Sequence, residues 1–257
     1  MRIGRKAAGV VVVGLVGVVG LSRASAATTN DERCSLPTFG PGPDYRPVID
    51  PGSFSPNVTN RLFPLVPGRT LIYTGVKDGK TALNIFAATA ATKVIDGVAT
   101  RVVQDRLYLD GVLEERTADY YAQDRCGNVW YFGEDTARLD EQGAVVSTAG
   151  SFRAGEHGAQ PGVFMQARPM LGRSFRQEWA AGQAEDQFKA IAKNAPVTVR
   201  AGSFRGLQTE EITALEPEVV DNKFFVQGIG EVLEVAVKGG TERLELVEII
   251  EGSRTTK

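Results

Sequence analysis

The side chains of this chain best suited to chemistry are carboxylates near one predicted group of hairpins. They share a place at strand ends or next to turns: Asp119, Glu134, Asp135, Glu185 and Asp186. Two carboxyls in an aromatic-lined groove can hydrolyse glycosidic bonds, one as the acid and the other as base or nucleophile. Such acids also suit calcium, which prefers oxygen ligands, or serve only as solvated strand ends. The sequence leaves these three interpretations open.

The histidine His157 is the other candidate for catalysis. It lies in a glycine-rich stretch, AGEHGAQPG, beside Glu156. Imidazole titrates near neutrality, so His157 is a candidate general base, and the alternative is a solvated loop residue. The sequence contains no G-x-S-x-G elbow, no second histidine for a metal site and no glycine-rich phosphate loop after a strand.

The two cysteines, Cys34 and Cys126, allow a single pairing. An even cysteine count in an exported chain indicates a disulfide, which would contribute about 4 kcal/mol by closing a long loop. The alternative is a metal site or redox pair, but C-x-x-C spacing and further histidines are absent from the sequence. We expect a disulfide, no metal site and no cofactor, with calcium left as an alternative.

The first 26 residues predict export. A basic head (1–6) precedes an uncharged apolar run (7–21), and Ala24-Ser25-Ala26 supplies the small residues of a cleavage site. The apolar run is shorter than the roughly 20 residues of a membrane span, so we expect a cleaved signal peptide rather than an anchor. The mature protein is predicted to be secreted, in the extracellular or cell-envelope space, without a membrane anchor.

The charge of the remaining chain excludes two classes of partner. The segment 1–26 holds four basic residues and no acids, which leaves 25 basic and 31 acidic side chains. A mildly acidic chain has no electrostatic footprint for nucleic acid and no basic cluster for an anionic membrane surface.

Turn signals divide the rest of the chain. Residues 27–67 are rich in Pro, Gly, Asn and Ser, which predicts an extended arm over the domain surface, anchored by Leu62, Phe63 and Leu65. A single antiparallel β domain is expected over 68–251, and a disordered tail over 252–257.

Three Asp-Gly pairs favour tight hairpin turns within this domain, at 78–79, 96–97 and 110–111. The strands between turn signals are expected near 69–77, 80–94, 98–109, 112–124, 128–135, 144–149, 173–181, 184–193, 196–200, 206–214, 219–227, 231–238 and 242–250. Alanine gives 81–92 and 184–193 some helix propensity, but both lie between hairpin signals, so strands are preferred.

Adjacent aromatic residues indicate the shape of the sheet. Tyr120-Tyr121, Phe224-Phe225 and Trp130-Tyr131-Phe132 place rings on both faces, because neighbouring strand residues point in opposite directions. Either a second layer covers one face or the sheet curls around the rings. With little helix to serve as cover, we expect an all-β, antiparallel meander that forms a strongly curled sheet, a half-barrel or barrel.

Two parts of this domain resemble each other. In both 98–137 and 204–237, an aromatic doublet precedes a pair ending in Gln, and a glycine turn then leads into an apolar strand. The likeness indicates either a duplicated three-strand unit or two unrelated hairpins that share the same pattern of turn and strand residues.

The same segments carry a wider resemblance. Residues 120–136 (YYAQDRCGNVWYFGEDT) are similar to a motif in uncharacterised secreted bacterial β-proteins, and 222–232 (NKFFVQGIGEV) resembles a hairpin of exported bacterial proteins with curved sheets. Over 69–250 the chain resembles half-barrels like the periplasmic lipoprotein carriers. The resemblance implies a fold and assigns no catalytic residue.

These observations predict a non-enzymatic protein that binds a small apolar or amphipathic ligand. The aromatic residues expected to line its site are Tyr121, Trp130, Phe132, Trp179 and Phe225. The alternatives are a secreted carbohydrate-active hydrolase or lyase that uses a carboxylate pair, and an extracellular structural or interaction module. Enzymatic activity is left open.

Overall fold

A computed structural model describes residues 34–252, which form a β structure with two short 3-10 helices. The predicted signal peptide and residues 253–257 of the predicted tail lie outside the described residues. The helices are η1 (Gly42–Asp44) and η2 (Pro51–Ser53), so no helix within 34–252 is long enough to cross a bilayer. The strands are β1 (Phe54–Ser55), β2 (Thr70–Lys77), β3 (Lys80–Ile95), β4 (Val98–Leu109), β5 (Val112–Asp124), β6 (Val129–Leu139), β7 (Val145–Ser147), β8 (Phe152–Arg153), β9 (Gln160–Met165), β10 (Ser174–Arg176), β11 (Glu178–Trp179), β12 (Asp186–Val199), β13 (Gly202–Thr213), β14 (Val220–Val226), β15 (Gly230–Lys238) and β16 (Arg243–Ile250).

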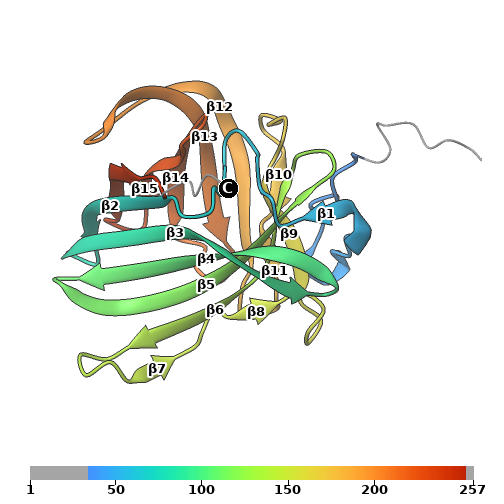
Figure 1. Cartoon of the computed structure of the whole chain (residues 1–257), viewed down its shortest axis with the longest axis horizontal. Coiled ribbons are helices and arrows are strands. Elements are labelled where there is room, and N and C mark those ends of the chain that lie inside the picture. Colours follow the sequence, from blue (N-terminus) through green and yellow to red (C-terminus); the bar gives the residue numbers. More distant parts are fainter. Residues whose placement is uncertain (1–33, 253–257) are drawn as a thin grey trace, which may run out of the picture. The chain divides into compact units, whose positions relative to one another are not determined.

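The strands form one curled antiparallel sheet (Figure 1), which confirms the predicted fold class. Its main path runs β10-β12-β13-β14-β15-β16-β2-β3-β4-β5-β6-β9-β11. The two ends of this path, β10 and β11, are separated in the chain by Gln177 alone. The sheet therefore nearly closes into a barrel through one short segment. Gly162 permits this closure, because a Cβ there would lie 2.3 Å from the Gln177 carbonyl carbon.

The Asp-Gly pairs form the hairpin turns that the sequence predicts. Asp78, Asp96 and Asp110 have φ of 53°, 47° and 48°, and the following glycines also have positive φ. Two consecutive residues with positive φ give the turn a twist that matches the flanking strands. These three turns connect β2 to β3, β3 to β4 and β4 to β5.

Most strands lie where the sequence places them, including the two segments with helix propensity. Residues 81–92 belong to β3, and 184–193 fall largely in β12. The expected strands 184–193 and 196–200 are one strand with two register shifts. Strand β9 is the principal element not predicted, because its first residues, Gln160-Pro161-Gly162, have the composition of a turn.

Rings lie on both faces of the sheet, and each face is covered. Phe54 of the N-terminal arm packs edge-on against Trp130 and Phe132, at centroid distances of 5.8 and 5.3 Å. Leu36 and Ile49 pack against the same cluster. Residues 36–54 thus cover part of the outer face of the sheet. The sheet therefore both curls around one set of rings and is covered on its other face by a second layer.

The aromatic doublets share an irregularity of the sheet. The register between β5 and β6 shifts at Tyr120/Tyr121, and the register between β14 and β15 shifts at Phe224/Phe225. Both predicted repeat units are three-stranded meanders with this shift at the doublet. A β-bulge there increases local bending, which suits a sheet that must curl. Duplication itself stays a prediction.

The second half of the arm alternates exposed residues, such as Thr59 and Arg61, with residues that are buried. Val58, Phe63 and Leu65 are buried in the interior core with Tyr121, Val129 and Phe225, so residues 57–67 form a plug that covers the interior of the curled sheet. The distal part of the β12–β13 hairpin covers another part of the interior, because Val197 and Val199 pack with Leu244 and Leu246 of β16.

The disulfide Cys34–Cys126 is formed, with a Cα–Cα distance of 5.6 Å, as the sequence predicts. It joins the start of the described arm to the turn between β5 and β6.

Replacing Cys126 by Ser is expected to lower the free energy of unfolding by about 2–4 kcal/mol. The reason is that the bond spans 92 residues and restricts the unfolded chain. Urea unfolding should give the same loss for Cys34→Ser and for the double variant. Additive losses would show that the two cysteines act separately.

Candidate functional site

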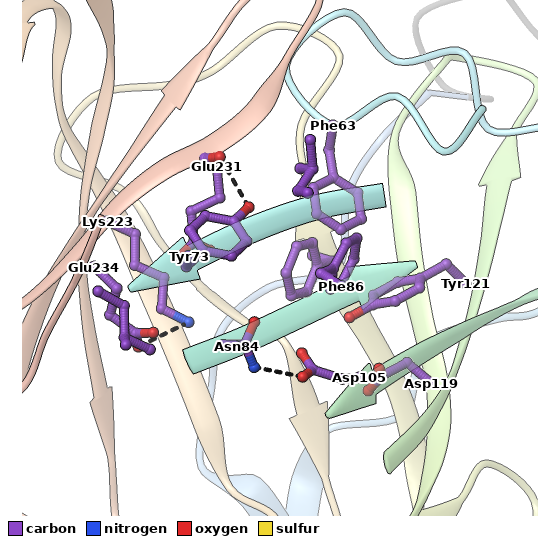
Figure 2. A pocket seen from close by; sticks show the side chains of 13 residues that line it. Phe63, Tyr73, Asn84, Phe86, Asp105, Asp119, Tyr121, Lys223, Glu231 and Glu234 are labelled. Atoms are coloured by element: carbon purple, nitrogen blue, oxygen red, sulfur yellow. Dashed lines mark hydrogen bonds and ion pairs between the residues drawn. The ribbon is translucent and has the colours of Figure 1, made fainter. Parts of the chain in front are cut away.

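A cavity of about 170 Å³ lies within the curled sheet; we call it the inner cavity. Its wall has an aromatic and aliphatic part and a polar part (Figure 2). The lining residues are Phe63, Leu71, Tyr73, Asn84, Phe86, Asp105, Asp119, Tyr121, Phe164, Lys223, Glu231, Glu234 and Leu244.

Strand alternation brings these side chains to one face. Leu71 and Tyr73 of β2 pair with Phe86 and Asn84 of β3, and Phe86 in turn pairs with Asp105 of β4. Residues two apart on a strand share a face, so apolar and polar positions alternate in rows across β2, β3 and β4. Inward positions of a sheet that serves only as a structural core are normally apolar, so the polar residues here are unusual.

Phe63 of the plug closes part of the cavity with aromatic contacts. Its ring lies 4.5 Å from Phe164, 5.2 Å from Tyr121 and 5.9 Å from Phe86, measured between centroids. Asn60 fixes the plug, because its Oδ1 accepts hydrogen bonds from the backbone N–H groups of residues 62 and 63. The plug is therefore an ordered part of the cavity wall.

Two acids of the polar wall, Asp105 and Asp119, resist ionisation. Burial raises the pKa of Asp105 to about 6, although Asn84 donates a hydrogen bond to its carboxylate. Burial and the negative charge of Glu134 raise the pKa of Asp119 well above its usual range, while a hydrogen bond from Tyr131 at 2.6 Å acts in the opposite direction. Both shifts have desolvation as their main cause.

Lys223 supplies positive charge on the opposite part of the wall. Its Nζ lies 3.2 Å from Glu211 and 3.3 Å from Glu234. Burial by itself would lower the pKa of Lys223, but these carboxylates and Glu231 raise it well above the usual value. The ammonium is thus charged and already has two carboxylate partners.

A second hollow, of about 480 Å³, lies beside β6 and β8; we call it the rim pocket. Three of the predicted catalytic residues line it: Glu134, Asp135 and His157. Burial raises the pKa of Glu134 to about 7, against a hydrogen bond from Thr136.

Asp135 is held in a different environment from Glu134. It contacts Lys93 at 3.1 Å and Arg153 at 2.7 Å, and Tyr120 donates to it at 2.6 Å. Burial opposes ionisation, but these three partners together lower the pKa of Asp135. Its carboxylate is engaged in an ion-pair network, and His157 is exposed in its loop with φ of 51°.

The remaining predicted acids lie on different elements. Asp119 is the direct cross-strand neighbour of Glu134 but lines the inner cavity rather than the rim pocket. Glu185 accepts a hydrogen bond from Gly182 N in a turn, and Asp186 starts β12 opposite Thr213. Within residues 34–252, no three His, Cys, Asp or Glu side chains are arranged to hold a metal ion.

The predicted aromatic residues separate between the two faces of the sheet. Tyr121 lines the inner cavity, and Phe225 lies in the same core, with its ring 6.5 Å from Phe63. Trp130 and Phe132 pack under the arm instead. Trp179 also faces the arm, where a Cβ on Gly42 would lie 2.0 Å from its ring.

Several residues of the site were not singled out by the sequence analysis. Phe86 and Asp105 lie on the consecutive strands β3 and β4, whereas Lys223 and Glu231 lie far along the chain on β14 and β15. One signal for Asp105 is available in the sequence, since it interrupts the inward series Val103, Asp105, Leu107 in an otherwise apolar alternation. Lys223 carries no comparable signal, because its partners lie on β13 and β15.

Comparison with known proteins gives distant structural likenesses only. No protein-family model matches the chain, and no curated protein matches it. A candidate exported protein of YmcC-like fold from Bacteroides fragilis is 13% identical, covers 75% of this chain and 100% of its own, and has a TM-score of 0.45. A candidate lipoprotein from Parabacteroides distasonis is 9% identical, covers 74% of this chain and 99% of its own, and has a TM-score of 0.39. Neither likeness assigns a function to the site, and the resemblance to lipoprotein carriers stays a prediction.

Proposed function

We propose that this protein is an exported, non-enzymatic binding protein that holds a small amphipathic ligand in the inner cavity. The observation that carries the proposal is the divided wall of this cavity. Phe63, Phe86 and Phe164 supply apolar surface, while Asp105 and Asp119 supply polar groups. Binding sites for small molecules typically combine an apolar lining with a few placed polar groups.

The size of the cavity limits the ligand. An apolar cavity of about 150 Å³ holds a benzene ring. The inner cavity, at about 170 Å³, therefore suits a group of roughly one ring with a small polar substituent. A lipid chain would need more space than this, unless the plug moved.

The export part of the proposal depends on two features. The charge and hydropathy pattern of residues 1–26 is that of a signal peptide, and the disulfide Cys34–Cys126 suits an oxidising compartment.

A carbohydrate-active hydrolase or lyase is the second candidate, and one observation favours it. Asp119 and Glu134 are cross-strand neighbours, and the pKa of each is raised, in Glu134 to about 7. A glycosidase needs two carboxyls that flank the same bond. Here Asp119 lines the inner cavity and Glu134 lines the rim pocket, so binding is the better supported function.

Three probes of the same shape test the binding function: benzylamine, benzyl alcohol and benzoate. At least one should bind the wild-type protein in isothermal titration calorimetry, with Kd of about 1 mM or lower. Leu244→Trp should abolish that binding, because Leu244 lines the cavity and a larger side chain would fill it.

Circular dichroism must first show that Leu244→Trp is folded; if it is not, Leu71→Phe fills the same cavity with a smaller change. Glu141→Gln, on an exposed turn, is the matched control and should bind as the wild type does. If none of the three probes binds, or if cavity filling leaves binding unchanged, the proposed function is wrong.

A further inference from the structure

The inner cavity contains more negative than positive groups. Among its lining residues the acids are Asp105, Asp119, Glu231 and Glu234, and the base is Lys223. Lys223 is already paired with Glu234 and with Glu211, which lies outside the lining. It therefore has no charge left over to balance Asp105 or Asp119.

Asp105 and Asp119 lie on adjacent strands and point toward the same space. Asp105 pairs with Thr117, two residues before Asp119, so the two acids are diagonal neighbours on one face. Each carboxylate accepts one side-chain hydrogen bond, from Asn84 and Tyr131 respectively. Neither acid has a Lys or Arg partner within the described part of the chain.

Tyr121 provides an independent indication of a ligand. Its side chain is buried, with 4% exposure, and its hydroxyl makes no hydrogen bond to any residue that the structure describes. Figure 2 shows this hydroxyl directed into the cavity, on the side of Asp105 and Asp119. A tyrosine hydroxyl both donates and accepts hydrogen bonds, so this group is placed to bond an occupant of the cavity.

The rest of the wall decides what kind of cation fits. Phe63, Phe86 and Tyr121 line the same cavity as the acids, and ring faces attract organic cations through the π-system. Metal ions instead need several oxygen, nitrogen or sulfur ligands, and within residues 34–252 no three His, Cys, Asp or Glu side chains are arranged to supply them. Aromatic surface beside two carboxylates suits an organic ammonium group.

We propose that the inner cavity takes a primary ammonium joined to an apolar body of about one ring. The inference rests on the proposed binding function and specifies the polar end of the ligand. The ammonium N–H groups donate to Asp105 and Asp119 and to the Tyr121 hydroxyl oxygen. The apolar body lies against Phe63, Phe86 and Phe164.

The three probes named above separate this inference from the binding function. Near pH 8, benzylamine should bind at least about tenfold more tightly than benzyl alcohol, and benzoate should bind least. Tyr121→Phe should weaken benzylamine binding severalfold while leaving benzyl alcohol binding less affected. Glu141→Gln is again the matched control for removal of a carboxylate.

Asp119→Asn should remove the preference for benzylamine over benzyl alcohol, and benzyl alcohol binding serves to show that the variant still has its cavity. If benzyl alcohol or benzoate binds as tightly as benzylamine in the wild type, the ammonium inference is wrong and the binding function stands. If no probe binds, both are wrong.

Discussion

Asp105→Asn is expected to stabilise the empty protein near pH 8 and to weaken benzylamine binding at the same time. Burial raises the pKa of Asp105 from 3.8 to about 6, so above pH 6 the folded protein holds a buried carboxylate that it disfavours. Removing that charge should raise the free energy of unfolding by up to about 3 kcal/mol. The measurement is urea unfolding of both proteins, each without ligand.

The gain in the free energy of unfolding of Asp105→Asn should depend on pH. Between about pH 4 and 6 the folded state binds more protons at Asp105 than the unfolded state, so the wild type loses stability as pH rises through this window. The negative charges of Glu115 on β5 and Glu234 on β15 add to the rise in the pKa of Asp105, while Lys223 of the same cavity wall is paired with Glu211 and Glu234. Near pH 4 the variant and wild type should therefore be almost equally stable.

The matched control is Glu141→Gln, which should leave stability unchanged at both pH values, because its carboxylate is exposed on a turn. A loss of stability in Asp105→Asn near pH 8 would mean that this carboxylate is a structural group satisfied within the fold. It would then be a poor candidate for a ligand contact.

Phe63→Ala is expected to lower the free energy of unfolding by about 3–5 kcal/mol. Phe63 is 4% exposed and contacts the rings of Phe86, Tyr121 and Phe164, with Phe225 further away. Its removal leaves a void where the plug meets the core and opens the inner cavity, so benzylamine binding should weaken as well. Thermal and urea unfolding measure the first effect, and calorimetry the second.

Val66→Ala is the control for this prediction. Val66 belongs to the same plug but is 40% exposed, so its truncation should change stability by about 0.5 kcal/mol or less. A loss below about 1 kcal/mol for Phe63→Ala would show that the plug contributes little to the core and that the cavity is open without it.

The fold could be predicted from local signals because those signals are strong here. The Asp-Gly pairs adopt the backbone angles that hairpin turns require, and the strands between them follow within a few residues. Strand β9 was not predicted, because its first residues have the composition of a turn. The strand expected near 173–181 is divided into β10 and β11, which pair with opposite ends of the sheet, and this division depends on how the whole sheet bends.

The site could be predicted only in part, for a related reason. Alternation shows that two adjacent rings point to opposite faces but not which ring points inward. Tyr121 and Tyr131 face the interior, whereas Trp130 and Phe132 lie under the arm. The pairing of Lys223 with acids on β13 and β15 arises from strand register, which the sequence pattern does not specify.

The most direct measurement is a crystal structure of the protein soaked with 4-bromobenzylamine, with the bromine located by anomalous scattering. The account predicts one bromine among Phe63, Phe86 and Phe164, with the ammonium nitrogen about 2.7–3.2 Å from a carboxylate oxygen of Asp105 or Asp119. Bromine at surface positions only, with water filling the inner cavity, would contradict the binding function. A bound probe whose nitrogen turns away from both carboxylates would contradict the ammonium site.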